Sequence, residues 1–76
     1  MTAFEGIRII DFSEGIAGPM ATMLLGDLGA EVIKVERPGG DRMKDHPGYL
    51  CWNRNKQVVT LDVHSFAGLS AARSLL

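Results

Sequence analysis

Three short stretches near the start of the chain decide the fold: residues 7–12 (IRIIDF), 19–28 (PMATMLLGDL) and 31–36 (EVIKVE). The outer two are rich in β-branched residues and predict strands. The middle one predicts a helix, because Pro19 suits a first helical position and Gly29 suits the position just past a helix end. A strand, a helix and a strand within about 30 residues predict a βαβ unit, in which the two strands are parallel.

The rest of the chain extends this unit. Glycines and prolines predict a long loop over residues 37–56, residues 57–63 are predicted as a third strand, and Ser65 is a suitable N-cap for a last helix. Each strand carries a pair of adjacent apolar residues, as parallel strands buried on both faces do: Ile9-Ile10, Val32-Ile33 and Val58-Val59. We therefore predict an α/β fold with a parallel sheet.

Two helices cannot cover both faces of such a sheet. Residues 70–76 also keep a helical rhythm, without the Gly, Asn or Pro that usually marks a helix end. We expect the chain to be the front part of something longer, with the missing cover supplied by further sequence or by a partner chain.

Composition excludes several classes of protein. The 76 residues are 46% hydrophobic and carry 8 Lys and Arg against 9 Asp and Glu, for a net charge of −1. A disordered tail has fewer apolar residues and more net charge, and the single Cys51 excludes an internal disulfide framework. No apolar run approaches the roughly 18–20 residues of a membrane span. Residues 1–5 lack the features of a secretory signal, so we expect a cytoplasmic protein.

Charge is unevenly distributed. Residues 1–33 have a net charge of −4, whereas residues 34–56 hold six basic and three acidic side chains. This positive segment follows the second strand, at the sheet edge where open α/β folds bind ligands. It therefore favours an anionic ligand, although a solvated loop would have the same composition.

The turn after the first strand, residues 15–19 (GIAGP), stands where a dinucleotide-binding fingerprint would lie. The fingerprint needs a second glycine where this chain has Ala17, so the match fails and an NAD(P)-binding unit is disfavoured. The turn still leads into a helix N-terminus, whose free N–H groups favour anions. The alternative is that Gly15 and Gly18 only allow a tight turn.

Glu36 and Arg37 end the second strand. In dinucleotide-binding proteins an acidic residue at this distance from the glycine turn binds a ribose, and a nearby Arg can hold a phosphate. Arg37 precedes a stiff Pro-Gly-Gly turn, which favours a fixed phosphate or adenine contact through its planar fork. The alternative is a surface Arg paired with Glu36 or Asp41.

Other chemistry has little support. His46 and His64 lie far apart, and no cysteine or carboxylate stands at ligand spacing, so we expect no metal site. We also expect no nucleic-acid partner and no membrane association. Cys51 is predicted to be a packing residue, and Asp11, at the end of a buried strand, to be structural.

Residues 6–13 (GIRIIDFS) and 17–39 (AGPMATMLLGDLGAEVIKVERPG) together resemble the start of the family III CoA-transferases. Residues 53–56 (NRNK) and 60–63 (TLDV) match further segments of that family at suitable distances. The family includes formyl-CoA transferase and α-methylacyl-CoA racemase. The resemblance implies a Rossmann-like large domain, of which residues 1–76 are the N-terminal part, a small domain, and two interlocked chains forming a homodimer.

The resemblance also implies a reaction. CoA moves from an acyl-CoA donor to a carboxylic acid acceptor, by way of a mixed anhydride and an aspartyl-CoA thioester on a catalytic aspartate. That aspartate is expected beyond residue 76, so no catalytic residue is assigned here and the chain alone is expected to be inactive. In the racemase branch an Asp and a His exchange the α-proton, and both are expected beyond the same point. A non-enzymatic, truncated product is the other alternative.

The residues that the resemblance assigns to coenzyme A come from three places. Two belong to the first turn, one contacts the adenine-nucleotide end, and four lie at the end of the third strand: Ile16, Ala17, Arg37, Leu61, Asp62, Val63 and His64. His64 departs from the family pattern, which commonly has Lys there, and a neutral His would give a phosphate less charge.

Overall fold

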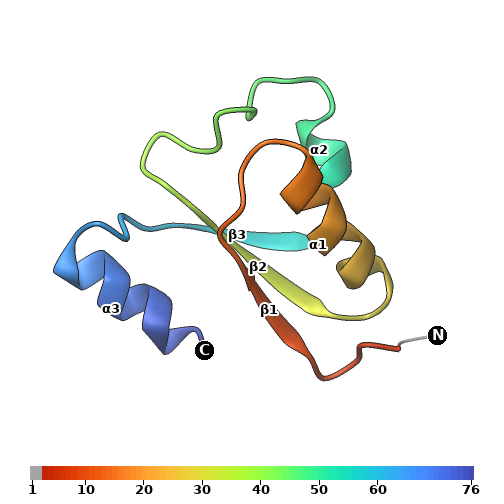
Figure 1. Ribbon diagram of the computed structural model, residues 1–76, viewed down its shortest axis with the longest axis horizontal. Coiled ribbons are helices and arrows are strands. Elements are labelled where there is room, and N and C mark those ends of the chain that lie inside the picture. Colours follow the sequence, from red (N-terminus) through yellow and green to blue (C-terminus); the bar gives the residue numbers. More distant parts are fainter. Residues whose placement is uncertain (1–2) are drawn as a thin grey trace.

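A three-stranded parallel sheet forms the centre of the molecule (Figure 1). The computed structural model describes residues 3–76, and its strands are β1 (Arg8–Asp11), β2 (Glu31–Glu36) and β3 (Lys56–Thr60), in the order β1-β2-β3. Val32 of β2 lies opposite Ile9 on one side and Lys56 on the other. The predicted α/β fold with parallel strands is confirmed.

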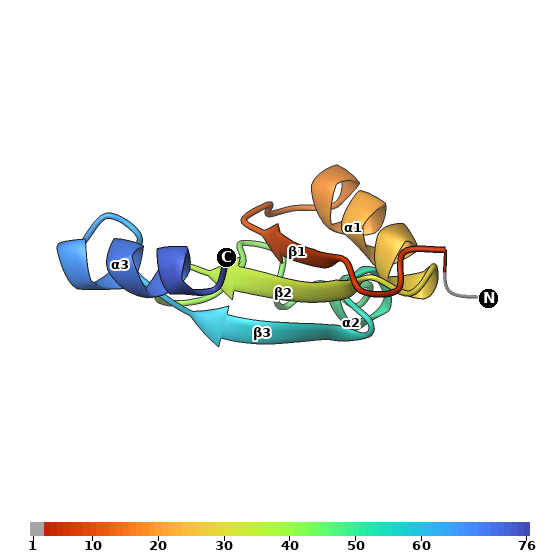
Figure 2. The same ribbon diagram turned by 90° about the horizontal axis from the view of Figure 1, so that it is seen from below.

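Helix α1 (Ala17–Asp27) connects β1 to β2 and packs against both strands (Figure 2). It begins two residues before Pro19, which therefore lies within the first turn instead of opening it. It ends as predicted, because Gly29 adopts φ 108° and donates to Gly26 O over 3.0 Å, while Ala30 N–H donates to Leu25 O over 3.1 Å. This pair of bonds is a Schellman motif, which needs a residue that tolerates the left-handed region.

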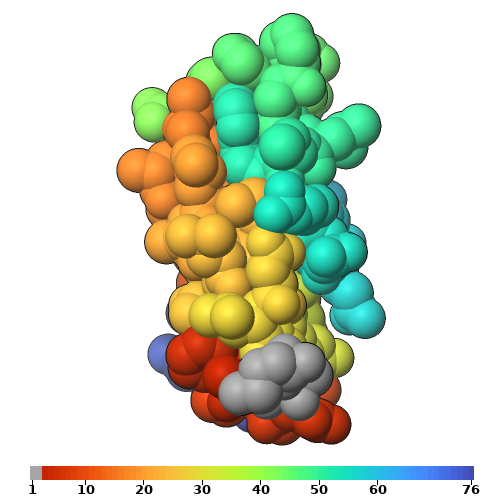
Figure 3. All heavy atoms as spheres, turned by 90° about the vertical axis from the view of Figure 1, so that its right-hand side faces the viewer, coloured from red at the N-terminus to blue at the C-terminus, as the bar shows by residue number. Residues whose placement is uncertain are grey.

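The segment predicted as a long loop contains a one-turn helix, α2 (Tyr49–Trp52), which packs against α1 (Figure 3). Four residues are too few to show a helical period, so the sequence carries no signal for it. The prediction that Cys51 is a packing residue is wrong, since its side chain is exposed. Trp52 faces inward instead, with its ring 5.1 Å from that of His46.

The third strand ends at Thr60, three residues earlier than predicted, because the chain turns at Asp62. The Asp62 carbonyl oxygen accepts hydrogen bonds from the backbone N–H and the hydroxyl of Ser65. Ser65 is the N-cap of helix α3 (Phe66–Ser74), as predicted, and its hydroxyl oxygen accepts from Gly68 N–H over 2.9 Å. Figures 1 and 2 show α3 beyond the end of the sheet at which the strands finish.

Burial differs among the strands. β2 is buried from Val32 to Glu36, as predicted for a central parallel strand. The two outer strands are only partly covered, and Val58 of β3 is 48% exposed. Four apolar side chains spaced four residues apart also form an exposed stripe along α1, each 42–55% exposed: Ile16, Met20, Leu24 and Leu28. None of the described helices is both long and apolar enough to cross a membrane.

Candidate ligand-binding crevice

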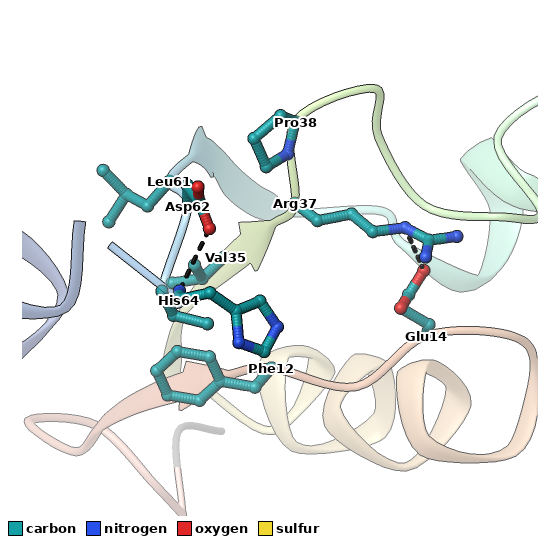
Figure 4. A pocket seen from close by; sticks show the side chains of 9 residues that line it. Phe12, Glu14, Val35, Arg37, Pro38, Leu61, Asp62 and His64 are labelled. Atoms are coloured by element: carbon teal, nitrogen blue, oxygen red, sulfur yellow. Dashed lines mark hydrogen bonds and ion pairs between the residues drawn. The ribbon is translucent and has the colours of Figure 1, made fainter. Parts of the chain in front are cut away.

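A cavity of about 450 Å³ lies at the edge where all three strands end (Figure 4). Its walls come from the connection after each strand, together with one residue of β2: Phe12, Glu14, Val35, Arg37, Pro38, Leu61, Asp62, Val63 and His64. Open α/β sheets bind their ligands outside this edge, at the carboxyl ends of the strands.

The lining combines an apolar part with a charged rim. Phe12, Val35 and Leu61 contribute apolar surface, and Glu14 and Arg37 face each other on one side of the cavity (Figure 4). Asp62 and His64 lie on the other side, where Asp62 Oδ1 accepts the backbone N–H of His64 over 3.0 Å. A ligand with a flat apolar portion and an anionic group matches this combination of surfaces.

The structure brings five of the seven predicted site residues together in the lining of this cavity: Arg37, Leu61, Asp62, Val63 and His64. The other two do not line it. Ile16 is the N-cap of α1 and Ala17 is the first residue of that helix, and both are exposed. They lie at the start of α1, which follows the connection that supplies Phe12 and Glu14.

Arg37 pairs with neither Glu36 nor Asp41, the partners named by the alternative of a surface arginine. Its Nε lies 3.3 Å from Glu14 Oε1 and also donates to Gly40 O over 3.3 Å. Glu36 accepts a hydrogen bond from the hydroxyl of Tyr49 instead. Burial, together with this bond, raises the pKa of Tyr49 well above its ordinary value. Glu36 therefore anchors α2 and does not line the crevice, which removes the ribose contact that an NAD(P) site would need.

A buried ion pair behind the crevice has no counterpart in the sequence predictions. Lys34 Nζ of β2 lies 2.8 Å from Asp41 Oδ2, and both side chains are fully buried. Lys34 also donates to Ser13 O over 3.0 Å, and Asp41 accepts from the N–H of Met43 over 2.8 Å. Burial alone would raise the pKa of Asp41, but these hydrogen bonds hold it below its ordinary value.

A second buried pair joins the last residue of β1 to the first residue of β3. Asp11 Oδ2 lies 3.0 Å from Lys56 Nζ and accepts from Thr22 Oγ1 over 2.7 Å. Burial opposes ionisation of Asp11, yet its hydrogen bonds with Ser13, Thr22 and Lys56 lower its pKa to about 2. Burial lowers the pKa of Lys56. With its carboxylate saturated by donors, Asp11 fits the predicted structural role.

The first of these pairs ties together the two connections, after β1 and after β2, that line the crevice. Lys34 joins Ser13, on the connection after β1, to Asp41, on the connection after β2. Gly15 N–H adds a longer bond to Asp41, of 3.4 Å. The signal for this arrangement is present in the sequence, because a lysine inside an apolar strand must be paired if it is buried. Among residues 3–76, no group of three His, Cys, Asp or Glu side chains could hold a metal ion.

The fold is a Rossmann-like unit, and its crevice lies at the carboxyl edge of a parallel sheet. The family model for CoA-transferase family III matches residues 4–76, so the chain belongs to that family. It is 42% identical to the succinyl-CoA:glutarate CoA-transferase of Mus musculus, over 99% of this chain and 20% of that protein. It is 48% identical to the succinyl-CoA:mesaconate CoA-transferase of Haloarcula hispanica, over 100% of this chain and 22% of that protein.

Solved structures carry the same fold. The crystal structure of the hypothetical protein Rv3272 from Mycobacterium tuberculosis matches with a TM-score of 0.92 and 38% sequence identity, over 99% of this chain and 23% of that one. The chain thus spans about a fifth of the length of the curated relatives named above. The predicted family and its Rossmann-like fold are confirmed.

Proposed function

We propose that the chain forms the coenzyme A crevice of an enzyme that transfers CoA from an acyl-CoA donor to a carboxylic acid acceptor. One observation carries the proposal: five residues that the family pattern assigns to coenzyme A, from two separate connections, line one cavity. The names of the mouse and Haloarcula relatives pair a CoA thioester with a carboxylic acid, which favours transfer over the racemase alternative.

The chemistry of the lining supports a nucleotide ligand. A guanidinium such as that of Arg37 can bind a phosphate with two parallel hydrogen bonds or stack on an adenine ring. The apolar side chains of the cavity suit the flat face of the base. Ile16 and Ala17 add the N-terminus of α1, whose free N–H groups and dipole favour a negative group nearby.

No carboxylate in this chain is proposed as the catalytic nucleophile. Asp11 and Asp41 are buried and saturated with hydrogen bonds, and Asp62 is held by the backbone of His64. We propose that the aspartate that carries the aspartyl-CoA thioester lies outside these 76 residues and that this chain alone is inactive. A cytoplasmic, interlocked homodimer remains part of the same proposal.

The proposal is tested by titrating the chain with coenzyme A in a calorimeter and comparing Arg37→Ala with Arg54→Ala. Arg37→Ala should weaken binding by about 10- to 100-fold, because one charge-assisted hydrogen bond contributes about 1.5–3 kcal/mol. Arg54 pairs with Asp27 at 2.6 Å and does not line the crevice, so its removal should leave the affinity unchanged. Equal affinities for both variants would refute the assignment of Arg37.

A further inference from the structure

We infer that Glu14 competes with the anionic part of the ligand for Arg37 and thereby sets how tightly the crevice holds a negatively charged ligand. The inference rests on the proposed function, because it concerns the same crevice. Glu14 is not among the residues that the sequence or the family pattern assigned to a site. The structure places its carboxylate in the cavity lining beside the guanidinium that would meet a phosphate.

The position of Glu14 is fixed from two sides. Its Oε1 lies 3.3 Å from Arg37 Nε, and the same oxygen accepts the backbone N–H of Arg42 over 3.1 Å. Both donors belong to the connection after β2, whereas Glu14 belongs to the connection after β1. Figure 4 shows the Arg37 side chain extending toward Glu14 and away from Asp62 and His64. An anionic ligand at the centre of the crevice must therefore draw Arg37 away from Glu14.

The competition is weak enough for a ligand to win. The side chains of Arg37 and Glu14 are 59% and 34% exposed, so solvent screens their attraction. Exposed pairs of this kind change an equilibrium by about fivefold or less. The rim nevertheless holds two carboxylates, Glu14 and Asp62, against one guanidinium. Neutralising Glu14 frees Arg37 and removes a repulsive charge, and both changes favour ligands that carry phosphates.

The test is Glu14→Gln, which keeps the shape of the side chain and removes its charge. The chain should bind coenzyme A about three- to fivefold more tightly at low ionic strength, where surface charges are least screened. Binding of pantetheine, which has no nucleotide and no charge, should not change. The matched control is Glu31→Gln, because Glu31 also pairs with an arginine, Arg8 at 2.7 Å, but does not line the crevice.

A second readout needs no ligand. The nuclear magnetic resonance signal of Arg37 Nε–H should shift in Glu14→Gln and stay in place in Glu31→Gln. An unshifted Arg37 signal, an unchanged affinity for coenzyme A, or an equal gain in Glu31→Gln overturns the inference and leaves the proposed function standing. If the Arg37 signal shifts in Glu14→Gln but neither the wild type nor the variants bind coenzyme A, the proposed function is overturned. The inference then fails as well, because no ligand competes with Glu14.

Discussion

Asp11 is the residue at which burial and hydrogen bonding act most strongly against each other. Its carboxylate is buried at the end of β1, where desolvation would favour the protonated form. Donors from Ser13, Thr22 and Lys56 reverse that preference and lower the pKa to about 2. The ionised form is therefore part of the folded state, and folding depends on it.

Stability should fall in acid for this reason. The folded pKa lies below the ordinary 3.8, so the contribution of Asp11 is complete above about pH 4 and is lost as the pH falls toward about 2. The shift corresponds to about 2 kcal/mol of unfolding free energy. Urea unfolding at a series of pH values measures the loss. Asp11→Asn should remove this component of the pH dependence, whereas a curve as steep as that of the wild type would contradict the role of Asp11.

At the residue scale, the sequence predicts those site residues whose positions follow from a local pattern. Arg37 and residues 61–64 follow strands, and the connections after parallel strands meet at one edge, so their convergence is predictable. Glu14 is different, because it finds its partner on another connection through the fold, whereas the place of Lys34 in an apolar strand indicates that it is paired but not with which residue. Glu14 meets Arg37 across 23 positions of sequence, and no spacing rule relates two such residues. The alternative, in which Arg37 is a surface arginine paired with Glu36 or Asp41, names the wrong partner, since Arg37 pairs with Glu14.

At the element scale, Gly68 determines how α3 meets the crevice. A Cβ atom at this position would clash with the carbonyl oxygen of Asp62. The start of α3 therefore lies directly on the segment that supplies residues 61–64 of the crevice.

Gly68→Ala should displace that segment and weaken the binding of coenzyme A. We expect a cost of about 1–3 kcal/mol in the free energy of unfolding, as for other overpacked sites, and a several-fold loss of affinity. Ser70→Ala in the same helix is the control, because Ser70 is exposed. Urea unfolding and calorimetry measure the two effects. An affinity equal to that of the wild type would show that the crevice does not depend on this contact.

Element boundaries show where sequence reasoning succeeds. The bounds of β2 are those predicted, because a run of buried residues ends at the polar Glu36 and a Pro-Gly-Gly turn follows Arg37. The prediction extends β3 three residues too far, because Leu61 and Val63 continue its apolar pattern although the backbone turns at Asp62. The turn is stabilised by the hydrogen bonds that Ser65 donates to the carbonyl oxygen of Asp62, and a hydrophobic pattern gives no signal for such bonds.

At the scale of the whole molecule, the chain differs from a domain that folds independently mainly in how much apolar surface it exposes. The stripe along α1 and the open side of β3 remain uncovered. Trp52 Nε1 is buried and has no hydrogen-bond partner among residues 3–76. The sequence predicts that further sequence or a partner chain covers these surfaces, because two helices are too few to cover both faces of the sheet. This remains a prediction.

The central claim is that coenzyme A binds in the crevice at the carboxyl edge of the sheet. The most direct measurement is a titration of the chain with coenzyme A, followed through the backbone amide signals of every residue. We predict saturable shifts at Arg37, at residues 61–64 and at the start of α1, and no such shifts at Arg8 or Glu31 at the opposite end of the sheet. Saturable shifts centred on that opposite end, or none at millimolar ligand, would contradict the account.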